Sequence, residues 1–451
     1  MDNGASALPE TTNFSQIDLI IEPEWIIPIE PARVTLTDHA IAIKNGLIVD
    51  VLPRAAAWQK FKPNETIALP GHAVMPGLVN LHTHAAMNLL RGYADDLPLM
   101  QWLNDRIWPA EGRFASPSFV RDGTLLACAE MLRGGVTCFN DMYFFPQAIA
   151  EAAVQIGMRA AIGLVIIDFP TNYASDVGDY LSKGLACRDQ WKNEALLSFN
   201  LAPHAPYTVS DESFERIGIL ASQLNLGIHI HLHETQDEIA QSLKQYGFRP
   251  LERIHRLGLL GPQFLAVHAV HLETNEIELL QKFGAHVAHC PSSNLKLGSG
   301  IAPVAKMKQH GVNFGIGTDG AASNNRLDSF AEMRLASLLA KGASGDATAL
   351  DAHQTLYAAT LGGARALGLE SQIGSVSAGK FADLCAVRLD DWQLMPRFDV
   401  ASHIVNVATR NDISDVWVAG VAKVRDGNLL PIDAGYLADT AEMWQNRILN
   451  V

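Results

Sequence analysis

The sequence predicts an α/β fold: a (β/α)8 TIM-like barrel of parallel strands, with a small second domain formed by both chain ends. Three observations lead to this prediction. From Gly71 onward, short apolar runs alternate with longer segments of helical periodicity, a pattern typical of repeated β-α units. Roughly eight such runs over about 300 residues favour a barrel. Candidate catalytic side chains follow several of these runs, and barrel active sites lie at the C-terminal ends of the strands.

The predicted elements follow in chain order. Residues 1–70 are β-rich and form the first part of the small domain, with strands at Ile17–Ile21, Ala40–Ile43 and Leu47–Leu52. Residues 71–373 form the barrel. Its predicted strands are Leu78–Leu81, Val136–Asn140, Ala160–Ile167, Leu196–Leu201, Gly227–His231, Leu265–His268, His286–Ala288 and Asn313–Gly317, and Phe119–Leu132 and Phe145–Ile156 are predicted helices.

Residues 374–451 return to a β-rich pattern and complete the small domain. Short strands are expected within Gly374–Val387, at His403–Val407 and within Val416–Val424, and a helix near Ala438–Leu449 closes the chain.

Composition limits the classes of function. The 451 residues are 48% hydrophobic and 18% charged, which is ample for a large core. The 48 acidic residues against 34 basic ones give a net charge of −14, which argues against a nucleic-acid or anionic-membrane partner. The start of the chain shows no signal peptide, and no apolar run approaches the roughly 20 residues of a membrane span. Five sparse cysteines suit a reducing compartment, so we expect a cytoplasmic protein.

His82 and His84 end the run Pro76-Gly-Leu-Val-Asn-Leu-His-Thr-His. Residues two apart share one face of a strand, so both imidazoles project together and form half of a metal site. The alternative to a metal site is that both are core histidines with satisfied hydrogen bonds. Later apolar runs are followed by further candidate residues, and this recurrence favours the metal site. The further candidates are His229, His231, His233, Glu234, His268 and Asp319. Because His229, His231 and His233 alternate onto one face, spacing alone does not choose among them.

These motifs resemble those of the amidohydrolase superfamily. The resemblance covers nearly the whole chain and rests on the stretch from Pro76 to His84, His231-Leu-His-Glu, Gly317-Thr-Asp-Gly and Gly379-Lys-Phe-Ala-Asp-Leu. It implies a distorted barrel beside a β-sandwich made from both chain ends. Finer matches resemble the 5-methylthioadenosine/S-adenosylhomocysteine deaminase branch: Asn88–Leu103, Ile107-Trp-Pro-Ala-Glu, Ala202-Pro-His-Ala-Pro-Tyr and His289-Cys-Pro-Ser-Ser-Asn-Leu-Lys-Leu-Gly-Ser-Gly.

The resemblance implies one divalent metal per chain, zinc or alternatively iron, held by His82, His84, His231 and Asp319. His229 is then expected to be a packing residue, and His233 a supporting neighbour or, alternatively, the ligand in place of His231. Such a metal lowers the pKa of a bound water to near neutrality. Glu234 would protonate the purine ring nitrogen, His268 would orient the attacking water, and Asp319 would carry its proton to the departing ammonia.

For the substrate, the resemblance implies that Glu111 accepts hydrogen bonds from the ribose hydroxyls and that His204 contacts a base nitrogen. Trp102 and Trp108 would pack against the nucleoside, whereas Asn294 and Lys296 receive no role. Some superfamily members bind a distal substrate carboxylate with arginines after the third strand. Here Arg159 lies inside the strand pattern and the stretch 168–183 has no arginine, which favours methylthioadenosine over S-adenosylhomocysteine.

The leading expectation is therefore hydrolytic deamination of an adenine nucleoside thioether to its inosine counterpart. The alternatives are guanine or other purine deamination, triazine dechlorination, and a noncatalytic scaffold, against which the complete ligand set argues. We expect a small-molecule nucleoside as the partner and a homo-oligomeric assembly.

Overall fold

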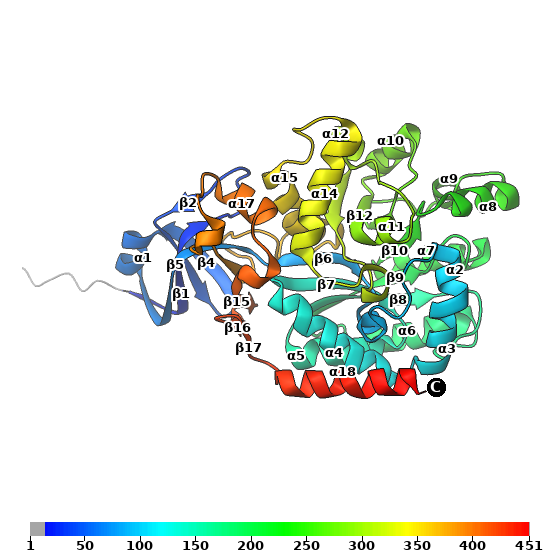
Figure 1. Cartoon of the computed structure of the whole chain (residues 1–451), viewed down its shortest axis with the longest axis horizontal. Helices are drawn as coiled ribbons and strands as arrows, with labels where there is room; N and C mark the ends of the chain where they lie inside the picture. The colour runs from blue at the N-terminus through cyan, green and yellow to red at the C-terminus, as the bar shows by residue number, and fades with distance from the viewer. Residues whose placement is uncertain (1–13, 451) are drawn as a thin grey trace, which may run out of the picture.

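The structure, a computed structural model, describes residues 14–450. The segment 1–13, over which no signal peptide is predicted, lies outside the described residues. Figure 1 shows two parts side by side: a barrel surrounded by helices, and a β-rich domain in which the blue N-terminal and orange C-terminal strands meet. No helix within residues 14–450 has the length and apolar character needed to cross a membrane.

Eight parallel strands form the barrel, in the spatial order β6 to β13. They are β6 (Leu78–Thr83), β7 (Val136–Tyr143), β8 (Arg159–Ile166), β9 (Leu197–Pro203), β10 (Gly227–Leu232), β11 (Phe264–His268), β12 (His286–His289) and β13 (Asn313–Ile316). These strands are almost entirely buried, as expected for a parallel sheet covered by helices. The predicted barrel fold is confirmed.

Side-chain and backbone contacts close the barrel between its first and last strands. The backbone N–H of Thr318, just after β13, donates to the Asn80 side chain on β6 at 2.9 Å. The Asp319 N–H donates to the carbonyl of His82 at 3.0 Å. Closure therefore brings Asp319 next to the histidine pair, 235 positions earlier in the sequence.

The helices around the barrel begin and end where sequence signals place them. Ser116 caps α4 (Pro117–Arg133), and Gly157 ends α5 (Pro146–Ile156) with φ +70°. The outer layer continues with α6 (Val177–Trp191), α7 (Asp211–Leu224), α8 (Gln236–Tyr246), α9 (Pro250–Arg256), α10 (Thr274–Phe283), α11 (Pro291–Lys296), α12 (Val304–Gln309), α13 (Ala321–Asn324), α14 (Ser329–Ser344), α15 (Ala352–Tyr357) and α16 (Gly363–Ala366).

A helical excursion follows β6 over the mouth of the barrel. It contains the 3-10 turn η1 (Ala85–Leu90), α2 (Leu99–Trp102), the π-helical turn η2 (Leu103–Ile107) and α3 (Trp108–Phe114). This segment supplies the apolar side of the cavity described below.

The second domain is one mixed sheet of nine strands that uses both chain ends. Its strands are β1 (Ser15–Ile26), β2 (Leu36–Thr37), β3 (His39–Lys44), β4 (Leu47–Pro53), β5 (Phe61–Pro76), β14 (Leu384–Arg388), β15 (Ile413–Val418), β16 (Val421–Arg425) and β17 (Asn428–Leu429), with α1 (Arg54–Lys60) between β4 and β5. β5 pairs with β1 on one side and with β14 on the other. Apolar residues of both chain ends pack in one cluster, including Ile21, Ile41, Leu384 and Trp417. The expected joining of the two ends is confirmed.

One predicted strand is wrong. Residues His403–Asn406 of the predicted strand His403–Val407 lie in a helix, α17 (Val400–Asn406), and Val407 is its C-cap residue; the side chain of Asp399 caps the first turn of this helix. The buried residues Ala401, Ile404 and Val405 have helical spacing, and this cap and period outweigh the β-branched residues. The predicted closing helix is present as α18 (Ala434–Leu449), which packs against α4 through the rings of Trp444 and Phe119 (Figure 1).

Candidate active site

Four donor atoms meet at the C-terminal ends of the first, fifth and eighth barrel strands. His82 Nε2 lies 3.2 Å from His231 Nε2 and 3.3 Å from Asp319 Oδ1, which is also 3.3 Å from His84 Nε2. Two ligands at about 2.1 Å from a tetrahedral zinc ion are about 3.4 Å apart. The donors of His82, His84 and Asp319 all lie within 4.8 Å of one another, and so do those of His82, His231 and His268, so this cluster of side chains fits a divalent metal.

Each histidine of this group is held through its other ring nitrogen. The Nδ1 atoms of His84 and His231 face the carbonyl oxygens of Met142 and His204, the second at 2.8 Å. A carbonyl only accepts, so each ring carries its proton on Nδ1 and directs the Nε2 lone pair to the common point.

His82 is held in a different way. Its Nδ1 lies 3.0 Å from Nε2 of His229, two residues before His231 on β10. His229 was expected to be a packing residue only. It is buried as expected, but its ring also fixes the orientation of His82.

The ionisation states suit metal binding. Burial lowers the pKa of His82 to about 4 and that of His231 well below its usual value, so both rings are neutral. Burial opposes ionisation of Asp319, yet the adjacent histidine rings hold the pKa of its carboxyl well below the usual range. Neutral imidazoles and an ionised carboxylate are the forms in which histidine and aspartate bind zinc in proteins.

The structure places His231, and not His233, next to His82. β10 ends at Leu232 and His233 has φ +57°, which breaks the strand alternation. The His233 Nε2 atom instead accepts the backbone N–H of Leu251 at 2.9 Å, at the start of α9.

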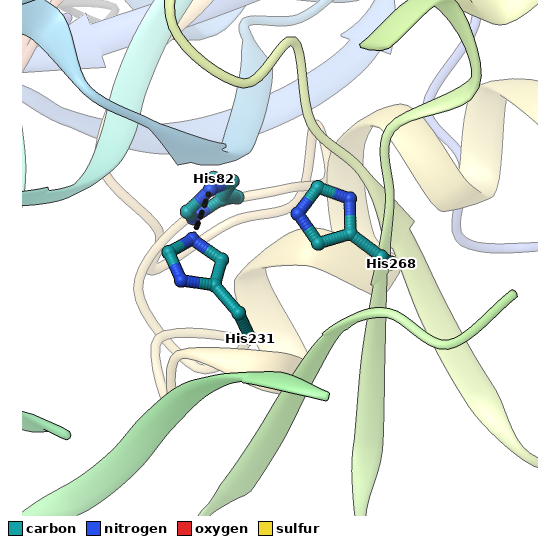
Figure 2. Close-up of side chains that lie close together, drawn as sticks. All are labelled: His82, His231 and His268. Carbon is teal, nitrogen blue, oxygen red and sulfur yellow. Dashed lines mark hydrogen bonds between the residues drawn. The ribbon is translucent and has the colours of Figure 1, made fainter. Parts of the chain in front are cut away.

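Glu234 and His268 lie beside the donors. His268 Nε2 is 3.7 Å from Glu234 Oε2, and burial raises the pKa of the Glu234 carboxyl. Figure 2 shows that the rings of His82, His231 and His268 come from separate strands and face one another. His268 and Asp319 have φ values of +71° and +60°. Such positive values are costly outside glycine and often occur at functional sites.

A cavity opens from this group toward the helical excursion. The predicted substrate contacts Glu111, His204 and Trp102 line it together with Glu234, His268 and Asp319. Burial lowers the pKa of His204 to about 3 and raises that of Glu111 to about 7. The Trp102 indole N–H donates to the Ala94 carbonyl at 3.1 Å, so Trp102 presents only its apolar ring.

An outer lobe continues the cavity and shares Trp108, Glu111, Phe144 and Ile167 with the inner one. Its remaining lining residues are Gly112, Ala115, Phe169, Pro170, Thr171 and Asn172. Arg159 lies elsewhere, at the opposite end of β8, where its guanidinium forms a buried pair with Asp383 at 2.9 Å.

Three contacts around the site were not anticipated. Ser293, Asn294 and Ser299 each bond to one of Asp319, His268 and Glu234. The stretch that contains them stands out in the sequence, but only the fold shows what it touches.

A model of the Amidohydrolase family matches residues 73–423. The chain belongs to the amidohydrolase family. Two relatives are each called "5-methylthioadenosine/S-adenosylhomocysteine deaminase". That of Teredinibacter turnerae is 45% identical over 97% of this chain and 99% of its own length. That of Saccharophagus degradans is 46% identical over 97% and 98%.

Solved structures agree with this family membership. A structure of an adenosine deaminase from Xanthomonas campestris with bound zinc has 50% identity and a TM-score of 0.96, covering 97% of this chain and all of that one. An Escherichia coli guanine deaminase has 25% identity and a TM-score of 0.82, covering 91% and 100%. A triazine hydrolase variant, with 24% identity and a TM-score of 0.88 over 94% and 99%, shares the fold.

Proposed function

We propose that this amidohydrolase is a zinc-dependent deaminase that converts an adenine nucleoside and water into the inosine counterpart and ammonia, with 5′-methylthioadenosine as its preferred substrate. The observation that carries the proposal is the shared cavity. One continuous space is lined by three of the proposed metal ligands, by the buried acid Glu234 and by a second carboxyl group, that of Glu111. The proposal is also supported by the Teredinibacter turnerae relative, which is named a 5-methylthioadenosine/S-adenosylhomocysteine deaminase and is 45% identical over nearly the full length of both chains.

The proposed ligands are His82, His84, His231 and Asp319, with zinc favoured over iron. When bound there, zinc lowers the pKa of a water molecule and so supplies a nucleophile at neutral pH.

The surrounding side chains move the protons. Glu234 holds its proton at neutral pH more readily than an exposed glutamate, because burial raises its pKa. It donates this proton to N1 of the adenine ring, which makes C6 electrophilic. His268 orients the attacking water, Asp319 carries one proton of that water to the amino group that leaves as ammonia, and the second proton of the water returns Glu234 to its acid form.

The cavity walls fit a nucleoside. Neutral His204 bonds a base nitrogen, the ring of Trp102 packs against the substrate, and the Glu111 carboxylate accepts the two ribose hydroxyls. A free base such as guanine lacks that diol and would leave Glu111 without a partner. Glu111 therefore favours a nucleoside over guanine or a triazine, and the complete ligand set disfavours a noncatalytic scaffold.

The outer lobe favours a methylthio group at the 5′ position. Among the residues that line it, all within the described chain, Glu111 is the only ionisable one, and Trp108, Phe144, Ile167 and Phe169 are apolar. The carboxylate of a homocysteine substituent would meet no cation there. A methyl thioether would gain apolar contact.

The decisive experiment measures ammonia release by the zinc-loaded protein with methylthioadenosine, S-adenosylhomocysteine, adenosine and guanine. We expect the highest kcat/KM for methylthioadenosine and little release from guanine. Glu234→Gln should retain zinc and lose about 100-fold or more in kcat. No ammonia from any nucleoside, with one zinc ion per chain measured, would refute the deaminase proposal.

We also infer a homo-oligomer in the cytoplasm. Trp392, Met395 and Phe398 lie close together in sequence and are 79%, 52% and 92% exposed, which is unusual for large apolar side chains that meet no partner. All five cysteines are buried and unpaired, which suits a reducing compartment. Light scattering of the purified protein tests the assembly, and a monomeric mass would contradict it.

A further inference from the structure

A short segment after β12 contacts three of the residues proposed to act on the substrate. We call residues 291–300, which comprise α11 and the turn that follows it, the support segment. Ser293 Oγ donates to Asp319 Oδ2 at 2.6 Å, Asn294 Oδ1 lies 2.8 Å from His268 Nδ1, and Ser299 Oγ donates to Glu234 Oε1 at 3.3 Å. Each of the three residues is at most 5% exposed.

Hydrogen bonds fix the two ends of α11 within the support segment. The Lys296 ammonium bonds to Asp95 at 2.6 Å and to the Ala322 carbonyl at 2.9 Å. The Ser292 backbone N–H donates to Glu332 on α14 at 3.1 Å. These bonds tie α11 to its neighbours on the barrel mouth, so its side chains have little freedom to move.

The turn explains how Ser299 comes back to the site. Gly298 and Gly300 have φ values of +70° and +121°, and a Cβ at Gly300 would lie 3.0 Å from Val270. The Ser299 N–H then donates to the Asn294 carbonyl at 2.8 Å. This places the hydroxyl of Ser299 on the same side as the amide of Asn294.

Asn294 decides which nitrogen of His268 carries the proton. An amide oxygen only accepts hydrogen bonds, so a ring that faces it at 2.8 Å carries its proton on Nδ1. The Nε2 lone pair of His268 is then directed at Glu234 and the reaction space. The Asn294 Nδ2 atom is buried and has no hydrogen-bond partner within residues 14–450.

We propose that Asn294 is a positioning residue that holds His268 in the Nδ1–H form for the attack of water, and that Ser293 and Ser299 hold Asp319 and Glu234 in the same way. This inference rests on the proposed deaminase function. Ser293, Asn294 and Ser299 are not among the residues that line the substrate cavity. The inference therefore gives a role to a segment that contacts the reacting side chains on the side away from the cavity.

The test compares two substitutions at one position. Asn294→Leu has a similar volume and no acceptor, so kcat with methylthioadenosine should fall about 10- to 100-fold, while KM and zinc content stay near the wild-type values. Asn294→Asp restores an acceptor oxygen and should recover kcat to within about 5-fold. Leu295→Asn is the matched control: Leu295 lies on the same helix, is 42% exposed, and should tolerate the change.

Two results would overturn the inference while wild-type turnover is normal. One is an Asn294→Leu enzyme that is as fast as the wild type. The other is an equal loss in Asn294→Leu and Asn294→Asp, which would indicate packing alone. If the wild type itself releases no ammonia, the proposed function fails and these kinetic comparisons are not informative.

A second measurement is independent of turnover and of the stability of the leucine variant. Ring nitrogen NMR of histidine-labelled, zinc-loaded protein, with His268 assigned from its absence in His268→Gln, reports the protonated nitrogen. We expect the proton on Nδ1 in the wild type. A proton on Nε2 would mean that the Asn294 amide donates to His268, and would overturn the inference.

Discussion

Replacement of His229 by leucine should weaken zinc binding more than it weakens folding. His229 Nε2 lies 3.0 Å from Nδ1 of His82, and both rings are at most 1% exposed. When His82 binds a metal through Nε2, its proton must sit on Nδ1 and needs an acceptor. Leucine removes that acceptor and leaves a buried N–H unsatisfied.

The apoprotein can avoid this cost. Without a metal, His82 can carry its proton on Nε2, which lies 3.3 Å from Asp319 Oδ1. The cost of the unsatisfied N–H, about 1–3 kcal/mol, therefore appears mainly in the metal-bound state. At about 1.4 kcal/mol per factor of ten, zinc affinity should fall roughly 5- to 150-fold.

Competition with a chelator of known zinc affinity measures this change. His229→Gln offers a carbonyl oxygen as a substitute acceptor and should recover part of the loss, while urea unfolding of the apoproteins should show a smaller difference. A zinc affinity of His229→Leu within threefold of the wild type would refute the reasoning, because the hydrogen bond would then contribute nothing to His82 as a ligand.

Three further outcomes are expected. Glu111→Ala should raise KM for methylthioadenosine at least about 10-fold and spare inhibition by free adenine; equal losses for both would contradict the diol contact. Burial raises the pKa of Glu332 to about 7, so between pH 5 and 7 the unfolded chain ionises this group first and the free energy of unfolding falls as pH rises. Glu332→Gln should remove this pH-dependent change in the free energy of unfolding, which amounts to up to about 3 kcal/mol. If the free energies of unfolding of the wild type and the variant, measured with urea, change in parallel with pH, the prediction is contradicted. Asp383→Ala leaves the buried Arg159 unpaired and should lower the free energy of unfolding by about 3–5 kcal/mol; a urea midpoint like that of the wild type would count against the pair.

Local patterns in the chain were enough to predict the barrel and its strands. The β12 and β13 strands are only four residues each and contain polar residues, yet their short apolar cores and the β-α alternation identify them. The α17 error shows the limit of this reasoning. Ile404 and Val405 suit a strand by residue type, but the Asp399 cap and the packing of one face place them in a helix.

The residue types of the site are also visible in the sequence, because each candidate follows an apolar run and the ends of parallel strands share one edge. Selecting His231 required more than spacing. The end of β10 at Leu232 and the positive φ of His233 turn the next histidine toward α9, and strand periodicity does not predict where a strand stops.

The sequence by itself determined the eight-stranded barrel, the joining of its β-rich ends and the set of histidines and acids available for chemistry, because these depend on local periodicity and on the order of ligands along the chain. Only the tertiary structure decided which atoms meet. The approach of Asp319 to His82 depends on barrel closure, the bond from His229 to His82 on the register of separate strands, and the bonds from Asn294 and Ser299 on a turn that folds back over the barrel mouth. Those distances join residues up to 237 positions apart, and no local pattern encodes them.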